Sequence, residues 1–171
     1  MVDSQTPQRL LLRAARRNDL GALTALYNHY VLTSHCTFDI ESFTEQSRMP
    51  WWSIFDGERY LCLTALENDR LVGYACSTPF KSKAAYATSV EVSVYIAADH
   101  GGRGIGQRLY TELFAQLADA DVHRAYAGIA LPNEPSLALH AAFDFVEVSR
   151  FTEVGRKFDR YWDVAWLERS C

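Results

Sequence analysis

The stretch VYIAADHGGRGIGQRLYTELFAQL, residues 94–117, decides the fold of this chain. It joins an alternating apolar strand to an amphipathic helix through a turn that holds four of the nine glycines, at positions 101, 102, 104 and 106. Glycine allows a tight turn and lets a ligand approach the main chain. The first N–H groups of a helix have no helical acceptor and carry partial positive charge. The segment therefore predicts a binding site for a phosphate or diphosphate group.

Two common phosphate-binding motifs do not match this turn. The P-loop needs Gly-Lys followed by Ser or Thr, and no such lysine is present. The dinucleotide motif GxGxxG would start at Gly102 and Gly104 but meets Gln107 where it needs glycine. Arg103 and Arg108 can add positive charge at the turn. The plainer alternative is that the glycines serve the geometry of the turn alone.

Hydrophobic periodicity on both sides of the turn predicts one mixed α/β (α+β) domain with a central sheet. The strongest strand is 86–96, where apolar residues alternate with Glu91, Ser93 and Tyr95. The other expected elements are strand 10–14, helix 20–32, a short helix near 41–48 that ends before Pro50, strands 60–66 and 71–78 joined by a four-residue turn, helix 104–118, strand 123–131, helix 134–143, and strands 145–151 and 161–167.

Length and composition suit a single domain over residues 1–171, with 1–9 as a loose leader. The formal net charge of −4 argues against a protein that coats nucleic acid or an anionic membrane. The four cysteines are scattered without a CxxC pair, which predicts neither a metal site nor a disulfide framework. No stretch has the length of a signal peptide or a membrane span, so a reduced, cytoplasmic protein is expected.

The glycine-rich turn resembles the acyl-CoA-binding signature of the GNAT acetyltransferase superfamily. That signature is Gln or Arg, two residues, Gly, one residue, then Gly or Ala. Gly104 and Gly106 match it, whereas Gly101 replaces the first position. Residues from about 10 to 167 are similar to the phosphinothricin and amino-acid N-acetyltransferase type. The matching segments are NHYVLTS with Thr37-Phe38, FKSKAAY (80–86), VEVSVYI and LPNEPSLALH (131–140), and the last of these is the most specific.

The resemblance implies a sheet that opens between two middle strands, with acetyl-CoA in the gap and no metal. Main-chain amides of about 103–106 would meet the diphosphate, and the strand edge near Tyr95 and Ile96 would pair with the pantetheine arm. The residues that it implies for acetyl-CoA are Val94, Tyr95, Ile96, Gly102, Arg103, Gly104, Ile105, Gly106, Asn133 and Ser136.

Glu91 is the best candidate for the base that deprotonates the amine. It lies between Val90 and Val92, where burial would raise its pKa toward neutrality, and it matches the glutamate of the family. The alternative is a solvated glutamate at a strand edge. His140 matches the position of the family's acid, and general acid, substrate contact and structural histidine all stay open.

The resemblance implies a small amine as the acceptor, bound by substrate-side residues Phe38, Lys81, Lys83, Tyr86 and Ser93. Gly101 and Gly102 stand where this type has Gln-Arg, which leaves phosphinothricin open and suits methionine sulfoximine or sulfone equally well. A homodimer is expected. The alternatives are an acetyltransferase of a protein N-terminus or a polyamine, and a catalytically silent acyl-CoA sensor.

Overall fold

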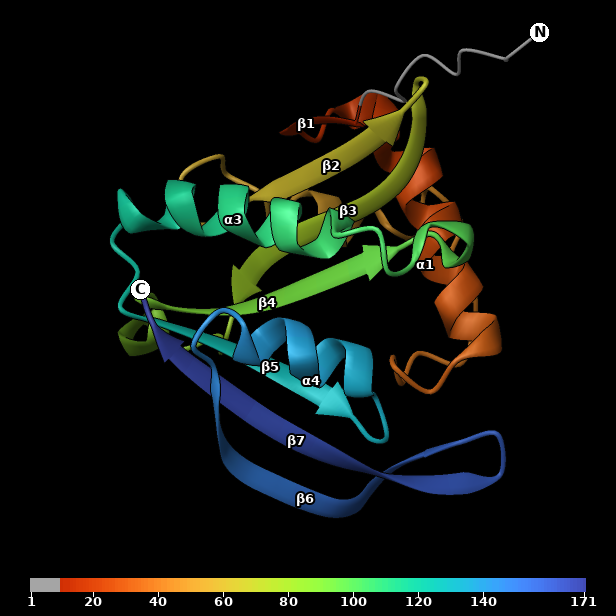
Figure 1. The fold of residues 1–171 in the computed structure, drawn as a ribbon, viewed down its shortest axis with the longest axis vertical. Coiled ribbons are helices and arrows are strands. Elements are labelled where there is room, and N and C mark those ends of the chain that lie inside the picture. The colour runs from red at the N-terminus through yellow and green to blue at the C-terminus, as the bar shows by residue number, and fades with distance from the viewer. Residues whose placement is uncertain (1–9) are drawn as a thin grey trace, which may run out of the picture.

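The computed structural model describes residues 10–171, and the leader expected at residues 1–9 lies outside the described residues. Seven strands form one mixed sheet in the order β1-β2-β3-β4-β5-β7-β6 (Figure 1). The strands are β1 (Leu10–Ala14), β2 (Cys62–Glu67), β3 (Arg70–Pro79), β4 (Ser89–Ile96), β5 (Arg124–Ala130), β6 (Val146–Lys157) and β7 (Arg160–Ser170). The α-helices are α1 (Leu20–Thr33), α2 (Met49–Trp52), α3 (Ile105–Ala118) and α4 (Glu134–Ala141), with single 3-10 turns at Arg17–Asp19, Ala84–Tyr86 and Ala98–His100.

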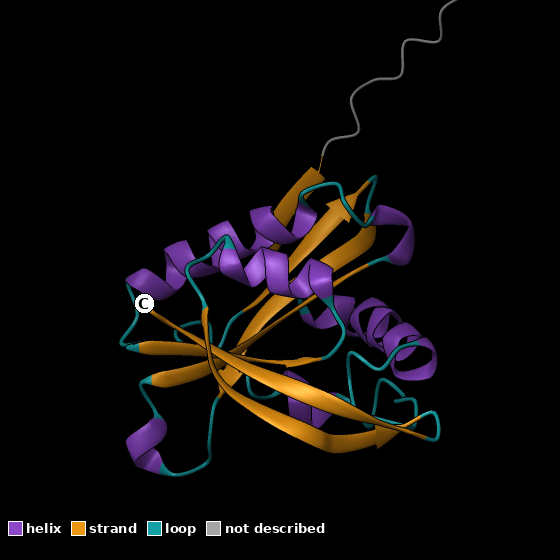
Figure 2. Cartoon of the chain, turned by 60° about the horizontal axis from the view of Figure 1, so that its bottom comes forward, coloured by secondary structure: helices purple, strands orange, loops and turns teal. Residues whose placement is uncertain are grey.

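The sheet opens between its two middle strands. β4 and β5 are parallel and pair only over Ser89–Glu91 with Arg124–Tyr126. Beyond Glu91 the two strands diverge, as two different views show (Figures 1 and 2). The expected opening of the sheet is therefore confirmed, and it leaves the facing edges of β4 and β5 without strand partners.

Alternation along β4 sends its side chains to two different layers. Val90 and Val92 join the core beneath α3, which packs against β2, β3 and β4. Tyr95 faces the opposite layer, which is covered by α1 and α2 and centred on Leu23 and Tyr74. Because strand side chains alternate, Glu91 and Ser93 share the face of Tyr95.

The expected helix near 41–48 is wrong. This segment is irregular, and the helix begins later, as α2, with Pro50 in its first turn. Proline has no N–H to donate and is well tolerated at a helix start, so Pro50 opens a helix instead of ending one. The Asn28 side chain holds the segment by donating to the Phe43 carbonyl and accepting from the Phe43 N–H, each at 2.8 Å.

Both hairpins turn more tightly than the sequence patterns indicate. Glu67 pairs with Arg70, so the turn between β2 and β3 has two residues instead of the four expected. Its two residues, Asn68 and Asp69, have φ of 51° and 62°, as a type I′ turn requires. The last hairpin is longer than expected because β6 and β7 extend to a similar two-residue turn.

No helix within residues 10–171 has the length and hydropathy to cross a membrane.

Candidate active site

The glycine-rich turn presents main-chain N–H groups at the start of α3. Gly102 and Gly104 have φ of 72° and 74°, a conformation that costs glycine little and other residues much more. The Arg108 N–H donates to the Gly104 carbonyl at 3.1 Å, so the N–H groups of residues 105–107 precede the helical ladder. These donors and the helix dipole form an environment suited to a diphosphate.

A groove of about 740 Å³ extends from this turn along the gap between β4 and β5. It brings together side chains and backbone from β4, the α3 start, β5 and α4. The residues predicted for acetyl-CoA that line it are Val94, Tyr95, Ile96, Gly102, Gly104, Gly106, Asn133 and Ser136.

Two residues predicted for acetyl-CoA direct their side chains elsewhere. Ile105 is 3% exposed and belongs to the core beneath α3. The Arg103 guanidinium donates to both carboxylate oxygens of Glu67, at 2.5 and 3.2 Å. His100, in the same turn, lies 3.0 Å from Glu67 through Nε2. Arg103 can therefore contribute its main chain to the turn, while its side chain ties the turn to β2.

The edge of β4 that faces the gap offers main-chain groups to a ligand. The Ala97 N–H donates to Val72 and the Ser89 carbonyl accepts from Phe80, so the odd-numbered residues of β4 bond toward β3. Alternation then turns the N–H and C=O groups of Val94 and Ile96 toward the gap. The Ile96 carbonyl accordingly accepts a hydrogen bond from the Tyr30 hydroxyl of α1.

Glu91 is the last paired residue of β4 before the strands separate. Burial raises the pKa of this carboxyl above its ordinary value, and the nearby positive charge of Lys81 opposes the shift. A carboxylate with a raised pKa accepts protons more readily at neutral pH. Glu91 therefore has the electrostatic environment of a general base, although its catalytic role stays a prediction.

His140 is 3% exposed, and both of its ring nitrogens have partners. Nδ1 lies 2.8 Å from the Ser136 carbonyl, which can only accept, so Nδ1 carries the hydrogen of the neutral ring. Nε2 then accepts from the Tyr110 hydroxyl at 3.0 Å. Burial lowers the pKa of His140, which favours this neutral form. His140 lines the groove, and its role as an acid stays a prediction.

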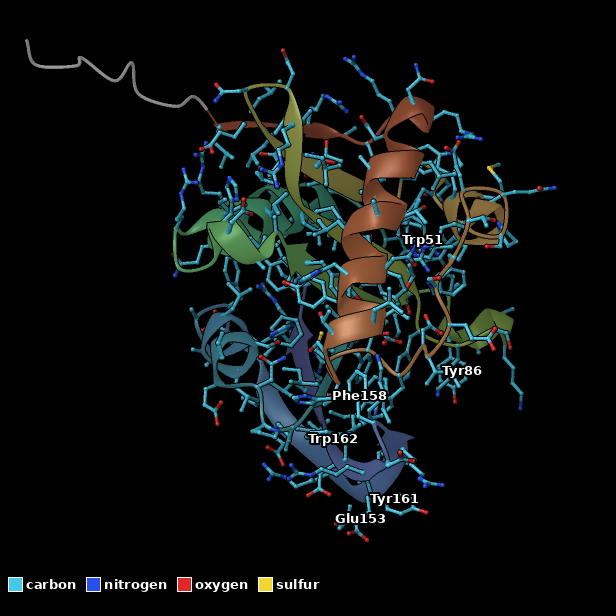
Figure 3. All side chains as sticks on the ribbon, turned by 90° about the vertical axis from the view of Figure 1, so that its right-hand side faces the viewer. Trp51, Tyr86, Glu153, Phe158, Tyr161 and Trp162 are labelled. Atoms are coloured by element: carbon cyan, nitrogen blue, oxygen red, sulfur yellow. The ribbon has the colours of Figure 1, made fainter. Side chains whose placement is uncertain are left out.

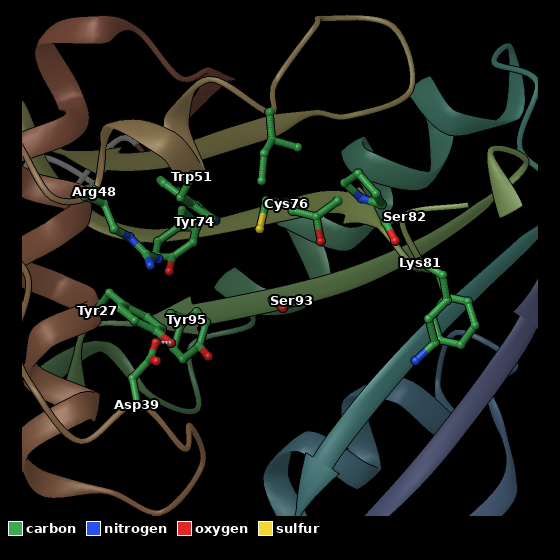
Figure 4. Close-up of a pocket in the computed structure, with 14 residues that line it drawn as sticks. Tyr27, Asp39, Arg48, Trp51, Tyr74, Cys76, Lys81, Ser82, Ser93 and Tyr95 are labelled. Atoms are coloured by element: carbon green, nitrogen blue, oxygen red, sulfur yellow. Dashed lines mark hydrogen bonds between the residues drawn. The ribbon is translucent and has the colours of Figure 1, made fainter. Parts of the chain in front are cut away.

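A second cavity of about 610 Å³ lies on the α1 and α2 side of the sheet (Figure 4). It meets the groove at Ser93 and Tyr95, which line both. Of the residues predicted for the acceptor, Lys81 and Ser93 line this cavity. The lining residues are Tyr27, Asp39, Arg48, Trp51, Ile54, Tyr74, Cys76, Thr78, Pro79, Phe80, Lys81, Ser82, Ser93 and Tyr95.

Three residues predicted for the acceptor do not line this cavity. Phe38 packs against Gly155 of β6 so closely that a Cβ there would overlap its ring. Lys83 and Tyr86 belong to the exposed loop between β3 and β4, and Tyr86 points outward (Figure 3). The structure thus gathers only part of the predicted acceptor site.

Sequence reasoning missed Arg48. Its guanidinium carbon lies 4.0 Å from the ring centre of Tyr27, 5.0 Å from that of Phe43 and 4.2 Å from that of Trp51. The arginine is 7% exposed and lines the second cavity. The Pro-Trp-Trp segment that follows is conspicuous in the sequence, but no helix or strand periodicity predicts that it lies next to Tyr27.

The comparisons with known proteins agree with this geometry. The family model described as "Acetyltransferase (GNAT) family" matches residues 23–145. The phosphinothricin N-acetyltransferase of Streptomyces coelicolor is 54% identical, with 92% of this chain and 94% of that protein covered. An L-methionine sulfoximine/L-methionine sulfone acetyltransferase of Salmonella typhimurium is 29% identical, with 93% of this chain and 93% of that protein covered. 

The solved structures agree as well. A crystal structure of a phosphinothricin acetyltransferase from Sinorhizobium meliloti in complex with acetyl-CoA superposes with a TM-score of 0.89. It is 29% identical, and the match covers 94% of this chain and 88% of that one. The two folds therefore agree along nearly the whole of this chain. This chain belongs to the acetyltransferase (GNAT) family.

Proposed function

We propose that the protein moves the acetyl group of acetyl-CoA to the primary amine of a small amino acid or analogue, by direct attack in a ternary complex. The observation that carries the proposal is the meeting of two cavities at Ser93 and Tyr95, with Glu91 on the same strand face. One cavity suits the long anionic co-substrate, and the other suits a small acceptor. The relatives named for phosphinothricin and for methionine sulfoximine or sulfone support this acceptor class.

The groove fits acetyl-CoA through its main chain. The N–H groups of residues 105–107 suit the diphosphate, because they combine unpaired donors with the helix dipole. The Val94 carbonyl and the Ile96 N–H on the edge of β4 suit the amides of the pantetheine arm, which would pair with this edge as a further strand does. Acetyl-CoA supplies the acetyl group as a thioester.

Glu91 accepts a proton from the acceptor's ammonium, directly or through one water, and so frees the nitrogen lone pair. The nitrogen forms a bond to the acetyl carbon while the carbon–sulfur bond breaks, and the sulfur leaves with the electron pair. The nitrogen then loses its second proton, which passes through water to the departing thiolate. A main-chain N–H of Ser93–Tyr95 stabilises the negative charge that develops on the acetyl oxygen. Val94 is best oriented for this, because its N–H points into the gap.

We infer that His140 positions α4 against α3 and that water protonates the departing thiolate. Direct donation from the neutral ring would break the bond between Nδ1 and the Ser136 carbonyl. The hydrogen bond between His140 Nε2 and the Tyr110 hydroxyl links α4 to α3. The groove wall that contacts the pantetheine arm thereby keeps a fixed spacing.

We further propose a homodimer and a cytoplasmic location. Several apolar side chains of the last hairpin are exposed on the sheet edge, namely Val146, Val148, Phe151, Val154, Phe158 and Tyr161. Figure 3 shows Phe158 and Tyr161 on this hairpin. The four cysteines are free thiols, which suits a reducing compartment.

The proposal is tested by following thiol release from acetyl-CoA with each of the standard amino acids, methionine sulfone, methionine sulfoximine and phosphinothricin, beside a polyamine and an N-terminal peptide. We expect turnover with at least one amino acid or analogue. Measurable acetyl-CoA binding without turnover of any amine would leave only an acyl-CoA sensor. Turnover restricted to the polyamine or the peptide would replace the proposed acceptor class.

A further inference from the structure

Arg48 lines the acceptor cavity, and within residues 10–171 its guanidinium has no hydrogen-bond acceptor. It is 7% exposed, and its Nε is fully buried without a hydrogen-bond partner. Within residues 10–171, no carboxylate lies within ion-pair distance of its guanidinium and no side-chain hydrogen bond satisfies it. A buried cation usually pairs with a carboxylate and donates several hydrogen bonds. Its donors are therefore available to something that enters the cavity.

The surroundings of Arg48 hold its charge without neutralising it. Tyr27, Phe43 and Trp51 present ring faces to the guanidinium, which favours the cation and fixes its plane. The carboxylate of Asp39, which also lines the cavity, accepts instead from the Tyr27 hydroxyl at 2.5 Å. The rings therefore orient the guanidinium and leave its hydrogen-bonding groups unused.

The position of Arg48 along the cavity suits a group of the acceptor other than its amine. Figure 4 shows Arg48 beside Tyr27 and Tyr74 at the end toward α1, with Ser93 between it and Lys81. Glu91 lies two residues before Ser93 on the same face of β4, about 7 Å at the usual rise of a strand. An amine held near Ser93 would thus direct the rest of its molecule either toward Arg48 or toward Lys81.

We propose that Arg48 binds an oxyanion of the acceptor, a carboxylate or phosphinate, and so selects amines that carry one. This inference rests on the proposed function. A guanidinium offers two parallel N–H donors that match the two oxygens of such a group. The positive charge also disfavours polyamines, which would bring a second cation to this end of the cavity, whereas a simple monoamine would offer Arg48 no oxyanion.

The first experiment measures equilibrium binding, which does not require turnover. Phosphinothricin, which carries both a carboxylate and a phosphinate, is titrated onto the wild-type protein saturated with CoA, and onto Arg48→Met, Arg48→Lys and Arg17→Met. Methionine is close to arginine in length and packs well against aromatic rings. Arg17 is the matched control, because it lies on the surface in an ion pair with Glu45. We expect Arg48→Met to weaken binding by about 10- to 100-fold, Arg48→Lys to weaken it less, and Arg17→Met to change nothing.

Steady-state kinetics then identify which oxyanion Arg48 binds. Methionine sulfone has only its α-carboxylate, phosphinothricin has a phosphinate as well, and the α-carboxamides of both lack the carboxylate. If Arg48 binds the α-carboxylate, Arg48→Met raises KM for both acids and abolishes the preference for acid over amide. If it binds the phosphinate, the variant loses phosphinothricin and keeps methionine sulfone. In either case KM for acetyl-CoA stays unchanged.

A structural arginine would give a different result. Thermal melting would then shift while the KM values and the preference for acid over amide stay within about twofold of wild type, which would overturn the proposal. Should Arg48→Met not fold, the wild-type enzyme still decides, because equal turnover of acids and uncharged amides would also overturn it. Failure of the proposed function is separate, since there the wild type would acetylate no amino acid at all.

Discussion

The carboxylate of Glu67, at the end of β2, accepts two hydrogen bonds from the guanidinium of Arg103, in the turn that precedes α3. The Glu67 side chain is only 6% exposed. Arg103, together with a weaker effect of His100, holds the pKa of Glu67 below its ordinary value. The hairpin β2–β3 thus fixes the turn whose N–H groups face the groove, even though neither side chain of the pair lines that groove.

Substituting Glu67→Gln is therefore expected to loosen the glycine-rich turn without touching the acceptor cavity. Glutamine keeps the size of glutamate but loses the charge that strengthens both hydrogen bonds. We expect KM for acetyl-CoA to rise about 3- to 10-fold, with KM for the acceptor unchanged. Glu147→Gln is the matched control, because Glu147 pairs with Arg150 on the exposed edge of the sheet. Equal effects of the two variants would show that the buried pair has no special role.

Glu91→Gln is expected to lower kcat/KM at neutral pH by roughly 10²- to 10⁴-fold, the usual contribution of a positioned base. The acidic limb of the wild-type pH profile should lie above the ordinary glutamate value of 4.5, because burial raises the pKa of Glu91. The variant should lose that limb. Acetyl-CoA binding serves as the control. An unchanged rate and an unchanged profile would assign the base to another group.

The same carboxyl is expected to oppose folding at neutral pH. A raised pKa means that the folded protein binds this proton more tightly than the unfolded chain does. Protonated Glu91 therefore favours the folded state. This contribution to the free energy of unfolding is fully present below pH 4.5 and is lost as the pH rises through the raised pKa of Glu91. Glu91→Gln should therefore melt at the same or a higher temperature than wild type at pH 7, and the difference should shrink near pH 4. Calorimetry at both pH values tests this, and a variant that melts lower at pH 7 would contradict it.

The sequence predicted the elements whose signals are local. The glycine-rich turn, the alternation through Glu91 and the apolar face of α3 depend on neighbouring residues alone, and the structure contains them all. The segment 41–48 depends instead on Asn28, more than a dozen residues earlier, whose side chain replaces the helical hydrogen bonds at Phe43. Periodicity does not report such a partner.

The candidate site likewise has one part that the local sequence predicts and one part that forms only when distant segments meet. The residues predicted for acetyl-CoA come from two short segments, 94–106 and 133–136, and most of them line one cavity. The acceptor cavity combines α1, the loop before α2 and two strands, so Arg48 meets Tyr27 and Trp51 only after folding. Phe38 and Tyr86 are close in sequence to residues that line the acceptor cavity, but they do not line it themselves. Phe38 packs on Gly155, and Tyr86 faces outward.

The proposed dimer can be tested at the exposed hairpin. Val148 and Phe151 of β6 are 49% and 48% exposed, and an edge strand with apolar side chains is a ready surface for a second copy. We expect Val148→Glu with Phe151→Glu to convert a dimer to a monomer in light scattering coupled to size-exclusion chromatography. Leu32→Glu is the control, since Leu32 is an exposed apolar residue of α1. A wild-type monomer at micromolar concentration would refute the dimer.

Removing the Tyr110 hydroxyl is expected to affect stability much more than chemistry. Tyr110 is fully buried, and in the neutral ring of His140 its hydroxyl is the donor to Nε2. Tyr110→Phe leaves that nitrogen buried without a donor, which should cost about 1–3 kcal/mol of unfolding free energy in denaturant titrations. Tyr161→Phe, at an exposed position, should cost almost nothing.

The rate separates a positioning role of His140 from an acid role. If His140 holds α4 against α3, kcat of Tyr110→Phe stays within about threefold of wild type, a change of less than 1 kcal/mol in the barrier. If the pair delivers the proton to the thiolate, removing the hydroxyl alters the hydrogen-bonding of Nε2 and shifts the basic limb of the pH profile. If kcat instead falls more than tenfold while the protein stays folded, His140 acts as the general acid of the reaction.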